Sequence, residues 1–264
     1  TDCSPGFGSV AKYVATSTLE AGLDVKSMSE TSTKVFILEV MGRHAGWIAA
    51  ASALASTNET DPPHIILMPE VPFAKKKFID KVKQTVANEG FCVVVASEGT
   101  RYKNGMFLAD SGLTDAFGHK QLGGVAPVLA QMISSIGFKN HWAVSDYLQR
   151  SARHISSKTD LDQAYAVGKK AVEFALAGKN AVMPVIKRLS DKPYKWKIES
   201  ASLSKVANVE KTLPKGYISK DGFRVTSKGL DYLRPLIQGE TPINYKDGIP
   251  VVANLKNILV KKIT

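Results

Sequence analysis

KVFILEVMGRHAGWIA, residues 34–49, predicts a buried strand, a polar turn and the start of a helix in one short stretch. The strand part is a nearly continuous run of β-forming apolar residues, which is typical of a parallel strand covered on both faces. In the turn, Gly42 allows the backbone to approach a ligand, and Arg43 offers a planar, permanently charged group that suits phosphate or carboxylate. Because free N–H groups at a helix start also attract anions, the stretch indicates an anion site.

The first hundred residues alternate between helix and strand patterns. Alternation of this kind predicts an α/β fold, in which a parallel sheet carries helices on both faces. Ligands of such sheets collect beyond the carboxyl ends of the strands, so we expect Met41–Arg43, Glu70 and Glu98 to face one crevice. The expected helices are 7–22, 45–56 and 73–89, and the expected strands are 34–40, 64–68 and 91–96.

The remainder of the chain has a less regular pattern. A helix over 159–178 is expected to be capped at Thr159–Asp160 and to end at Gly178. Frequent Pro and Gly after it predict loops, short strands and a small helix at 226–237. The other expected segments are a polar connection over 99–120, a helix over 121–136, a strand over 141–146, a turn over 147–153 and a strand over 181–186.

Composition narrows the class of protein. The chain has 264 residues, 44% hydrophobic and 22% charged, which is ordinary for a globular protein of one or two domains. No apolar run approaches the roughly 20 residues that cross a bilayer, and we expect no membrane partner. Cys3 and Cys92 form no disulfide framework, and the five histidines have no metal-ligand spacing, so a reducing cytoplasm and no metal site within this chain are expected.

The net charge of +11 raises nucleic acid as a partner. Its distribution argues against one, because Lys75–Lys77 and Lys261–Lys262 are isolated runs without interleaved aromatic residues or a known nucleic-acid motif. Both lysine runs are better explained as charged surfaces that face solvent than as nucleic-acid contacts. We therefore expect no nucleic-acid partner.

The turn MGRHAGW resembles the sugar-phosphate signature of the phosphofructokinase family, and its form is most similar to the pyrophosphate-dependent branch. Thr1–Ser9 resembles the segment after the catalytic loop of that family, Met68–Phe73 and Ala96–Gly99 match two strand ends, and Asp146–Arg150 resembles its phosphate-gripping turn. The similarity runs over nearly the whole chain but begins late in the family pattern. The donor loop and the segment with the catalytic base and metal carboxylates are expected upstream, so we interpret the chain as the C-terminal part of a longer enzyme.

The resemblance implies a two-lobed fold whose N-terminal part is absent. Residues 1–150 would form most of the sugar-phosphate lobe, and residues 151–264 would return into an incomplete donor lobe and add a C-terminal extension. The implied protein is a cytoplasmic, glycolytic homodimer or homotetramer. Its reaction is phosphoryl transfer from pyrophosphate, or ATP, to the 1-hydroxyl of fructose 6-phosphate, which gives fructose 1,6-bisphosphate.

Mg²⁺ is the implied cofactor, with its ligands upstream of this chain. The isolated chain is expected to be inactive, because we find in it neither a base for the acceptor hydroxyl nor a metal-phosphate cradle. The sequence leaves the choice between pyrophosphate and ATP open. A non-catalytic sugar-phosphate-binding or regulatory subunit of the same fold is the alternative function.

Phosphoryl transfer depends on positioning and charge stabilisation, and this chain is expected to supply the acceptor side. Arg43 is predicted to contact the transferring group, with Met41 and Gly42 shaping the turn; a surface Arg beside a packing glycine is the alternative. Glu98 follows a buried strand, where a lone carboxylate is costly. The family places a sugar-binding Glu there, while a capping or ion-paired Glu is the alternative. For Glu70, ligand contact and a structural ion pair are both open.

Tyr147 and Arg150 stand three residues apart, so a phenol and a guanidinium can converge on one phosphate. The resemblance assigns this pair to the 6-phosphate of fructose 6-phosphate. Lys34 occupies a position where family members present a basic residue to the site of the neighbouring subunit, and Lys139 and His141 are further candidates for that role. A solvated surface is the alternative for these three.

Overall fold

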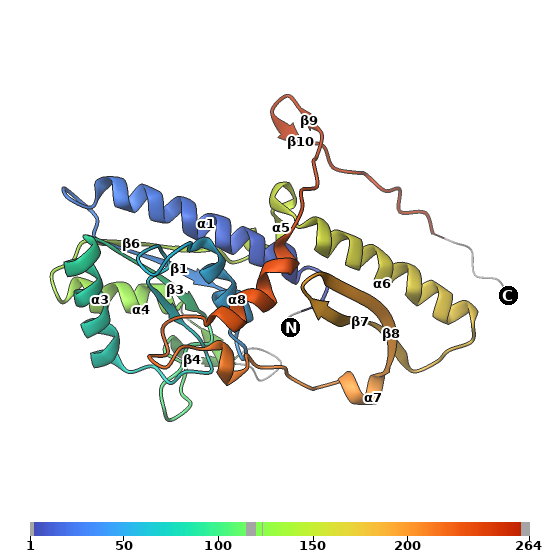
Figure 1. Cartoon of the computed structure of the whole chain (residues 1–264), viewed down its shortest axis with the longest axis horizontal. Coiled ribbons are helices and arrows are strands. Elements are labelled where there is room, and N and C mark those ends of the chain that lie inside the picture. Colours follow the sequence, from blue (N-terminus) through green and yellow to red (C-terminus); the bar gives the residue numbers. More distant parts are fainter. Residues whose placement is uncertain (1–2, 115–119, 123, 260–264) are drawn as a thin grey trace.

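A four-stranded parallel sheet forms the centre of the computed structural model, which describes residues 3–114, 120–122 and 124–259 (Figure 1). The strand order is β2-β3-β1-β6, and β1 pairs with β3 in register from Val35–Cys92 to Val40–Ser97. Parallel pairing brings the carboxyl ends of neighbouring strands to one edge of the sheet. The strands are β1 (Val35–Val40), β2 (Ile65–Leu67), β3 (Cys92–Ser97) and β6 (Asn140–Val144).

Helices cover both faces of this sheet, as the alternating pattern predicts. On one face, Phe78 of α3 (Lys75–Glu89) and Leu129 of α4 (Val125–Ser134) belong to the core cluster that includes Ile37. On the other, α1 (Phe7–Met28) and α2 (Trp47–Ala51) pack on the sheet, and the small residues of α2 allow close contact. Every residue of β3 is buried, which explains its continuous apolar sequence.

Several predicted elements are present with different ends. The first helix continues to Met28, and the helix expected over 45–56 divides into α2 and a 3₁₀ turn at Ser52–Ala55. The helix expected over 121–136 spans only Val125–Ser134. Within the described ranges, no helix is both long enough and apolar enough to cross a membrane.

The prediction of a polar connection over 99–120 was wrong. β4 (Asp110–Thr114) lies within it and pairs antiparallel with β5 (Lys120–Leu122), which also replaces the expected start of the next helix. This small hairpin is separate from the central sheet. Its strands, DSGLT and KQL, are short and have no long apolar run. The pattern that predicted the strands of the central sheet is therefore missing from them. Residues 115–119 lie outside the described residues.

The cap predicted for the helix over 159–178 was also wrong. α6 (Lys158–Leu176) is capped by Ser157, whose Oγ accepts the Asp160 N–H at 3.3 Å. The buried Asp160 carboxylate turns to α1 instead, where it accepts the N–H groups of Gly6 at 2.8 Å and Ser9 at 3.0 Å. A negative charge at a helix N-terminus is stabilising, so α6 anchors the start of α1. Gly178 follows the end of α6 with a φ of 70°, as predicted.

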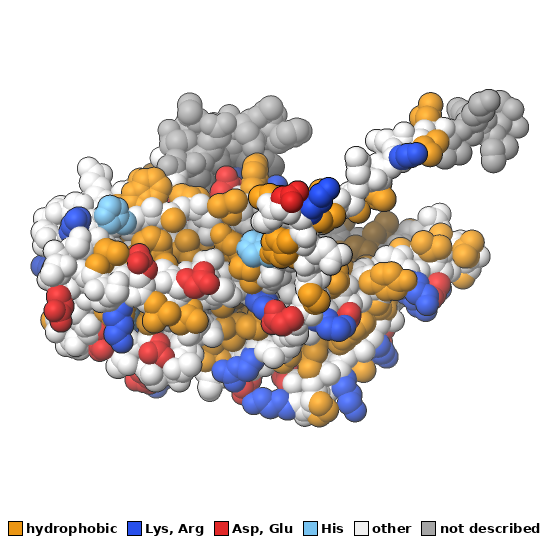
Figure 2. Space-filling view, turned by 90° about the horizontal axis from the view of Figure 1, so that it is seen from above, with side chains coloured by type: hydrophobic (Ala, Val, Ile, Leu, Met, Phe, Trp, Pro, Cys, Tyr) orange, Lys and Arg blue, Asp and Glu red, His pale blue; other side chains and the backbone are white. Residues whose placement is uncertain are grey.

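After β6, α6 and the hairpin over residues 182–202 extend to one side of the sheet, whereas residues 213–237, which include α8, pack back onto it (Figure 1). α6 exposes Tyr165 and Leu176, 76% and 85% accessible, and residues 251–259 form an arm on which hydrophobic side chains lie open (Figure 2). The strand expected at 181–186 lies in the first part of β7, which is longer than expected and forms a hairpin with β8. The elements are α5 (Leu148–Ser151), 3₁₀ Arg153–Ile155, β7 (Val182–Asp191), β8 (Tyr194–Ser202), α7 (Leu203–Val206), 3₁₀ Lys215–Tyr217, α8 (Ser227–Leu233), 3₁₀ Arg234–Ile237, β9 (Tyr245–Lys246) and β10 (Ile249–Pro250).

His64 is a buried histidine immediately before β2. Its Nδ1 accepts the Val93 N–H at 3.0 Å, and its Nε2 lies 3.1 Å from the carbonyl of Thr60. Only the neutral ring with its proton on Nε2 satisfies both partners, because a protonated ring has no acceptor. Burial lowers the pKa of His64 from 6.5 to about 4.

We expect acid to destabilise the chain through His64. The unfolded chain binds this proton near pH 6.5 and the folded chain only near pH 4, so the contribution is complete above pH 6.5 and is lost as the pH falls toward 4. The loss is on the order of 3 kcal/mol in the free energy of unfolding. Urea unfolding between pH 7.5 and 4 should show a shallower pH dependence in His64→Gln, whereas His154→Gln, at an exposed position, should match the unchanged chain. Equal pH dependence in all three would contradict the prediction.

Candidate functional site

The segments that follow three adjacent strands meet at one edge of the sheet. Met41–Arg43 follows β1, Glu98 follows β3 and Asp146–Arg150 follows β6. The Glu98 N–H donates to the Val40 carbonyl at 2.9 Å, so the backbone pairing continues beyond the strand ends. The predicted crevice therefore includes the turn and Glu98, and β6 adds the Tyr147–Arg150 segment.

The turn after β1 depends on Gly42. Its φ is 141°, and a Cβ at this position would lie 2.8 Å from the Ala45 carbonyl oxygen. A side chain at position 42 is therefore excluded both by the nearby carbonyl group and by the positive φ. The Gly42 N–H donates to Glu98 Oε1 at 3.2 Å, and its carbonyl accepts Ser97 Oγ at 2.5 Å. The end of β3 therefore holds the turn in place.

Arg43 combines a fixed backbone with an available charge. Its carbonyl accepts Arg101 Nη2 at 3.0 Å. Its half-buried guanidinium makes no hydrogen bond or ion pair with any residue in the described part of the chain. This arrangement presents a permanent cation at the edge where ligands of parallel sheets collect.

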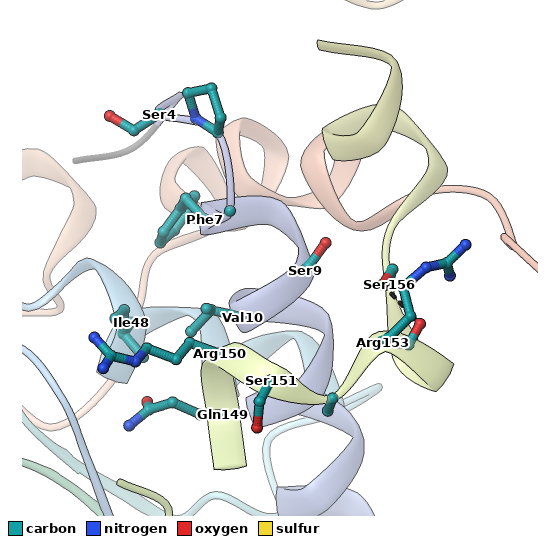
Figure 3. Close-up of a pocket in the computed structure, with 13 residues that line it drawn as sticks. Ser4, Phe7, Ser9, Val10, Ile48, Gln149, Arg150, Ser151, Arg153 and Ser156 are labelled. Atoms are coloured by element: carbon teal, nitrogen blue, oxygen red, sulfur yellow. Dashed lines mark hydrogen bonds between the residues drawn. The ribbon is translucent and has the colours of Figure 1, made fainter. Parts of the chain in front are cut away.

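Tyr147 and Arg150 lie together, as their spacing predicts. The guanidinium carbon of Arg150 is 4.4 Å from the centre of the Tyr147 ring, and both side chains are exposed. Arg150 also lines a cavity of about 470 Å³ between the start of α1, α2 and α5. In Figure 3, Arg150 extends from α5 toward Ile48 of α2, and Arg153 lies at the opposite side of this cavity. Cations on two sides give the cavity a positive lining.

Gln149 is a site residue that the sequence reasoning missed. It is only 2% exposed between the exposed Tyr147 and Arg150, and its Oε1 accepts the Met41 N–H at 3.3 Å. Its Nε2 donates to the Asp146 carbonyl at 2.8 Å. The amide therefore joins the turn after β1 to the segment after β6. A buried amide within a polar turn carries no local signal that would have revealed this contact.

Glu39 was also missed, although it is the single charge in the strand VFILEV. It is 5% exposed, and its Oε2 accepts the Ala126 N–H at 2.7 Å at the start of α4. Burial raises the pKa of Glu39, and the nearby carboxylates of Glu98 and Asp146 act in the same direction. This carboxyl group therefore joins the end of β1 to the first turn of α4. The isolated charge in an apolar run was the signal that could have found it.

Glu70 has a structural role. Its carboxylate accepts the Gly46 N–H at 2.9 and 3.1 Å and the Leu213 N–H at 2.7 Å. It therefore fixes the start of α2 and ties the segment near residue 213 to it. Neither an ion pair nor an open ligand contact is needed to account for this side chain.

Lys34, Lys139 and His141 lie at the opposite edge of the sheet from Arg43. The Lys34 N–H donates to the Lys139 carbonyl at 2.9 Å, where β1 and β6 begin. A strand as long as β1 spans about 20 Å at the usual rise per residue. The structure thus groups these three residues but does not bring them to the turn of their own chain.

The chain resembles known phosphofructokinases in sequence and structure. The profile of the family described as phosphofructokinase matches residues 1–175. The pyrophosphate–fructose 6-phosphate 1-phosphotransferases of Halomonas elongata and of Xanthomonas campestris pv. campestris are 61% and 57% identical, each over 99% of this chain. The solved pyrophosphate-dependent phosphofructokinase from Marinobacter aquaeolei is 59% identical over 100% of this chain, with a TM-score of 0.89.

This chain spans 63% of the length of each of these relatives. The part that matches the family profile contains the whole parallel sheet and the three strand ends that surround Arg43. The sheet, the turn and the sequence profile agree, and the chain belongs to the phosphofructokinase family.

Proposed function

We propose that the whole protein transfers a phosphoryl group from pyrophosphate to the 1-hydroxyl of fructose 6-phosphate and releases fructose 1,6-bisphosphate. The observation that carries this proposal is the turn after β1, where Arg101 holds the Arg43 carbonyl, the Arg43 guanidinium has no partner among the described residues, and the preceding Gly42 N–H donates to Glu98. The names of the Halomonas and Xanthomonas relatives support pyrophosphate as the donor. In this proposal the chain supplies the acceptor side, as the sequence predicts.

The roles of the site residues follow from their chemistry. Arg43 stabilises negative charge on the transferring phosphoryl group, because a planar cation matches phosphate oxygens. Glu98 accepts hydrogen bonds from sugar hydroxyls, with Met41 and Gly42 forming the wall of the sugar site. Tyr147 and Arg150 hold the 6-phosphate. Stacked side chains of this kind lose little freedom when they bind.

Mg²⁺ is the cofactor that the family resemblance implies. It binds oxygen ligands and neutralises charge on the donor phosphates. Among the residues that the structure describes, no group of three or more His, Cys, Asp or Glu side chains could hold a metal ion. These residues do not fit a Mg²⁺ site, so the proposal gives them no part in binding the cation.

We propose that residues 1–150 form most of the sugar-phosphate lobe and that residues 151–264 pack against a donor lobe. The exposed Tyr165 and Leu176 of α6 support this, because large apolar side chains on a projecting helix mark a surface that another element covers. A cytoplasmic, glycolytic role, which the family resemblance implies, is part of the same proposal.

The assembly that we propose is at least a homodimer, with a homotetramer as the larger possibility. Lys34, Lys139 and His141 lie too far from the turn of their own chain to serve it. β6 is an edge strand whose Trp142 is 47% exposed, so this side of the sheet is accessible to a second copy. The basic residues at the starts of β1 and β6 would then complete the site of the neighbour.

We expect Arg43→Ala to lower kcat of the whole protein by about a hundredfold or more, because a cation on the moving phosphoryl group stabilises the transition state. A coupled assay with fructose 6-phosphate, Mg²⁺ and pyrophosphate measures this, and circular dichroism should show an unchanged fold. Lys83→Ala, at an exposed position of α3, is the control. Near-normal turnover in Arg43→Ala would remove this residue from the reaction.

In the same assay, residues 1–264 alone should show no turnover.

Removal of Arg150 should weaken fructose 6-phosphate binding more than removal of the Tyr147 hydroxyl. Loss of a charge-assisted bond costs about 1.5–3 kcal/mol and loss of a neutral one about 1 kcal/mol. We therefore expect the dissociation constant to rise by about ten- to a hundredfold in Arg150→Ala and by about fivefold in Tyr147→Phe. Isothermal titration of the whole protein measures both. Unchanged affinity in Arg150→Ala would place the phosphate elsewhere.

Shared sites predict complementation between subunits. Arg43→Ala and Lys34→Ala proteins should each be impaired, and mixed oligomers should recover part of the activity, because one site in each hybrid retains both residues. Subunits with different affinity tags allow the hybrids to be purified before assay. Hybrids as inactive as their parents would show that each subunit has a self-contained site.

A further inference from the structure

The backbone of Arg43 rests on the segment that follows β3. A Cβ at Gly99 would lie 2.0 Å from the Arg43 carbonyl oxygen and 2.5 Å from that of Gly42. Atoms cannot approach so closely, so the contact requires glycine at position 99. The two loops are therefore in direct backbone contact, and the peptide that follows Arg43 is enclosed on one side by residue 99.

Arg101 holds this peptide from the same segment. Its Nη2 donates to the Arg43 carbonyl at 3.0 Å, and its Nε makes a longer contact with the Gly99 carbonyl at 3.4 Å. The guanidinium carbon lies 4.9 Å from the centre of the Phe107 ring. Such a ring contact restrains the plane of a guanidinium and adds cation–π attraction. One side chain thus connects both loops.

The backbone of Arg101 is itself fixed. Its carbonyl accepts the Phe73 N–H at 2.8 Å, and residues 101 and 107 form an isolated antiparallel bridge. Within the described residues, Arg101 is the single hydrogen-bond donor to the Arg43 carbonyl. Without it, the peptide after Arg43 could rotate, and rotation about the neighbouring bonds would displace the Arg43 side chain.

We propose that Arg101 is a positioning residue for phosphoryl transfer, which orients the Arg43 guanidinium through the carbonyl of Arg43. The inference rests on the proposed function. In the proposed function the sugar phosphate contacts Glu98, Tyr147 and Arg150, and Arg101 acts only through the backbone of Arg43. Its loss should therefore act on the chemical step, because a small misplacement of a catalytic group can cost up to a hundredfold in rate.

The experiment compares kcat and KM in the whole protein. Arg101→Ala should lower kcat about tenfold or more and change KM for fructose 6-phosphate less than threefold. Arg101→Lys should recover part of kcat, because an ammonium still donates to the Arg43 carbonyl but lacks the planar fork. Arg224→Ala is the matched control, since Arg224 also donates to a backbone carbonyl, that of Glu59, away from the turn. It should leave kcat unchanged.

A double-mutant cycle separates positioning from general destabilisation. Arg43→Lys keeps a cation but loses the planar fork, so correct placement of its backbone should matter less. Adding Arg101→Ala to Arg43→Lys should therefore lower kcat less than threefold further. If the two substitutions lower kcat by factors that multiply, the residues act independently, and the inference is overturned. Normal kcat in Arg101→Ala would overturn it as well. If Arg101→Ala does not fold, Arg101→Met, which keeps most of the side-chain volume but has no donor, takes its place in the cycle with the same criterion.

Failure of the inference and failure of the proposed function give different results. Full turnover in Arg43→Ala would contradict the proposed function. Loss of turnover in Arg43→Ala, together with normal turnover in Arg101→Ala, would contradict the positioning role alone. A large rise in KM for fructose 6-phosphate with unchanged kcat in Arg101→Ala would also exclude that role and would indicate a substrate contact.

Discussion

The in-register pairing of β1 with β3 is the constraint on which the rest of the site depends. Their buried backbone groups must be paired, and a slip by one residue would turn every buried side chain to the wrong face. The strands therefore end together at Val40 and Ser97, and Glu98 meets the N–H of Gly42. The position of a carboxylate beside a cationic turn thus follows from core packing on both faces of the sheet.

Close backbone contacts convert this shared edge into a defined site. Gly42 and Gly99 allow two loops to approach until carbonyl groups occupy the space where side chains would lie. The polar atoms enclosed there need partners, because an unpaired buried group is costly. Ser97 and Arg101 supply them. Arg101 thus holds the backbone of Arg43, while the Arg43 guanidinium makes no hydrogen bond or ion pair with the described residues.

Polar side chains then connect this site to distant parts of the chain. Gln149 joins the end of β6 to Met41, Glu70 joins α2 to the segment near Leu213, and Asp160 joins α6 to the start of α1. Each bond links residues separated by more than a hundred positions. The C-terminal segments are thus part of the support of the turn, although they lie outside the central sheet.

The sequence by itself determined the α/β class and the strand ends that meet at one edge, because periodicity is local. Turn chemistry together with the family resemblance made Arg43, Glu98, Tyr147 and Arg150 candidates. Only the tertiary structure decided the roles of Gln149, Glu39 and Arg101, the structural use of Glu70 and the true partner of Asp160. It also revealed the β4–β5 hairpin. Contacts across many intervening residues depend on how the helices pack against the sheet, and no local pattern encodes that packing.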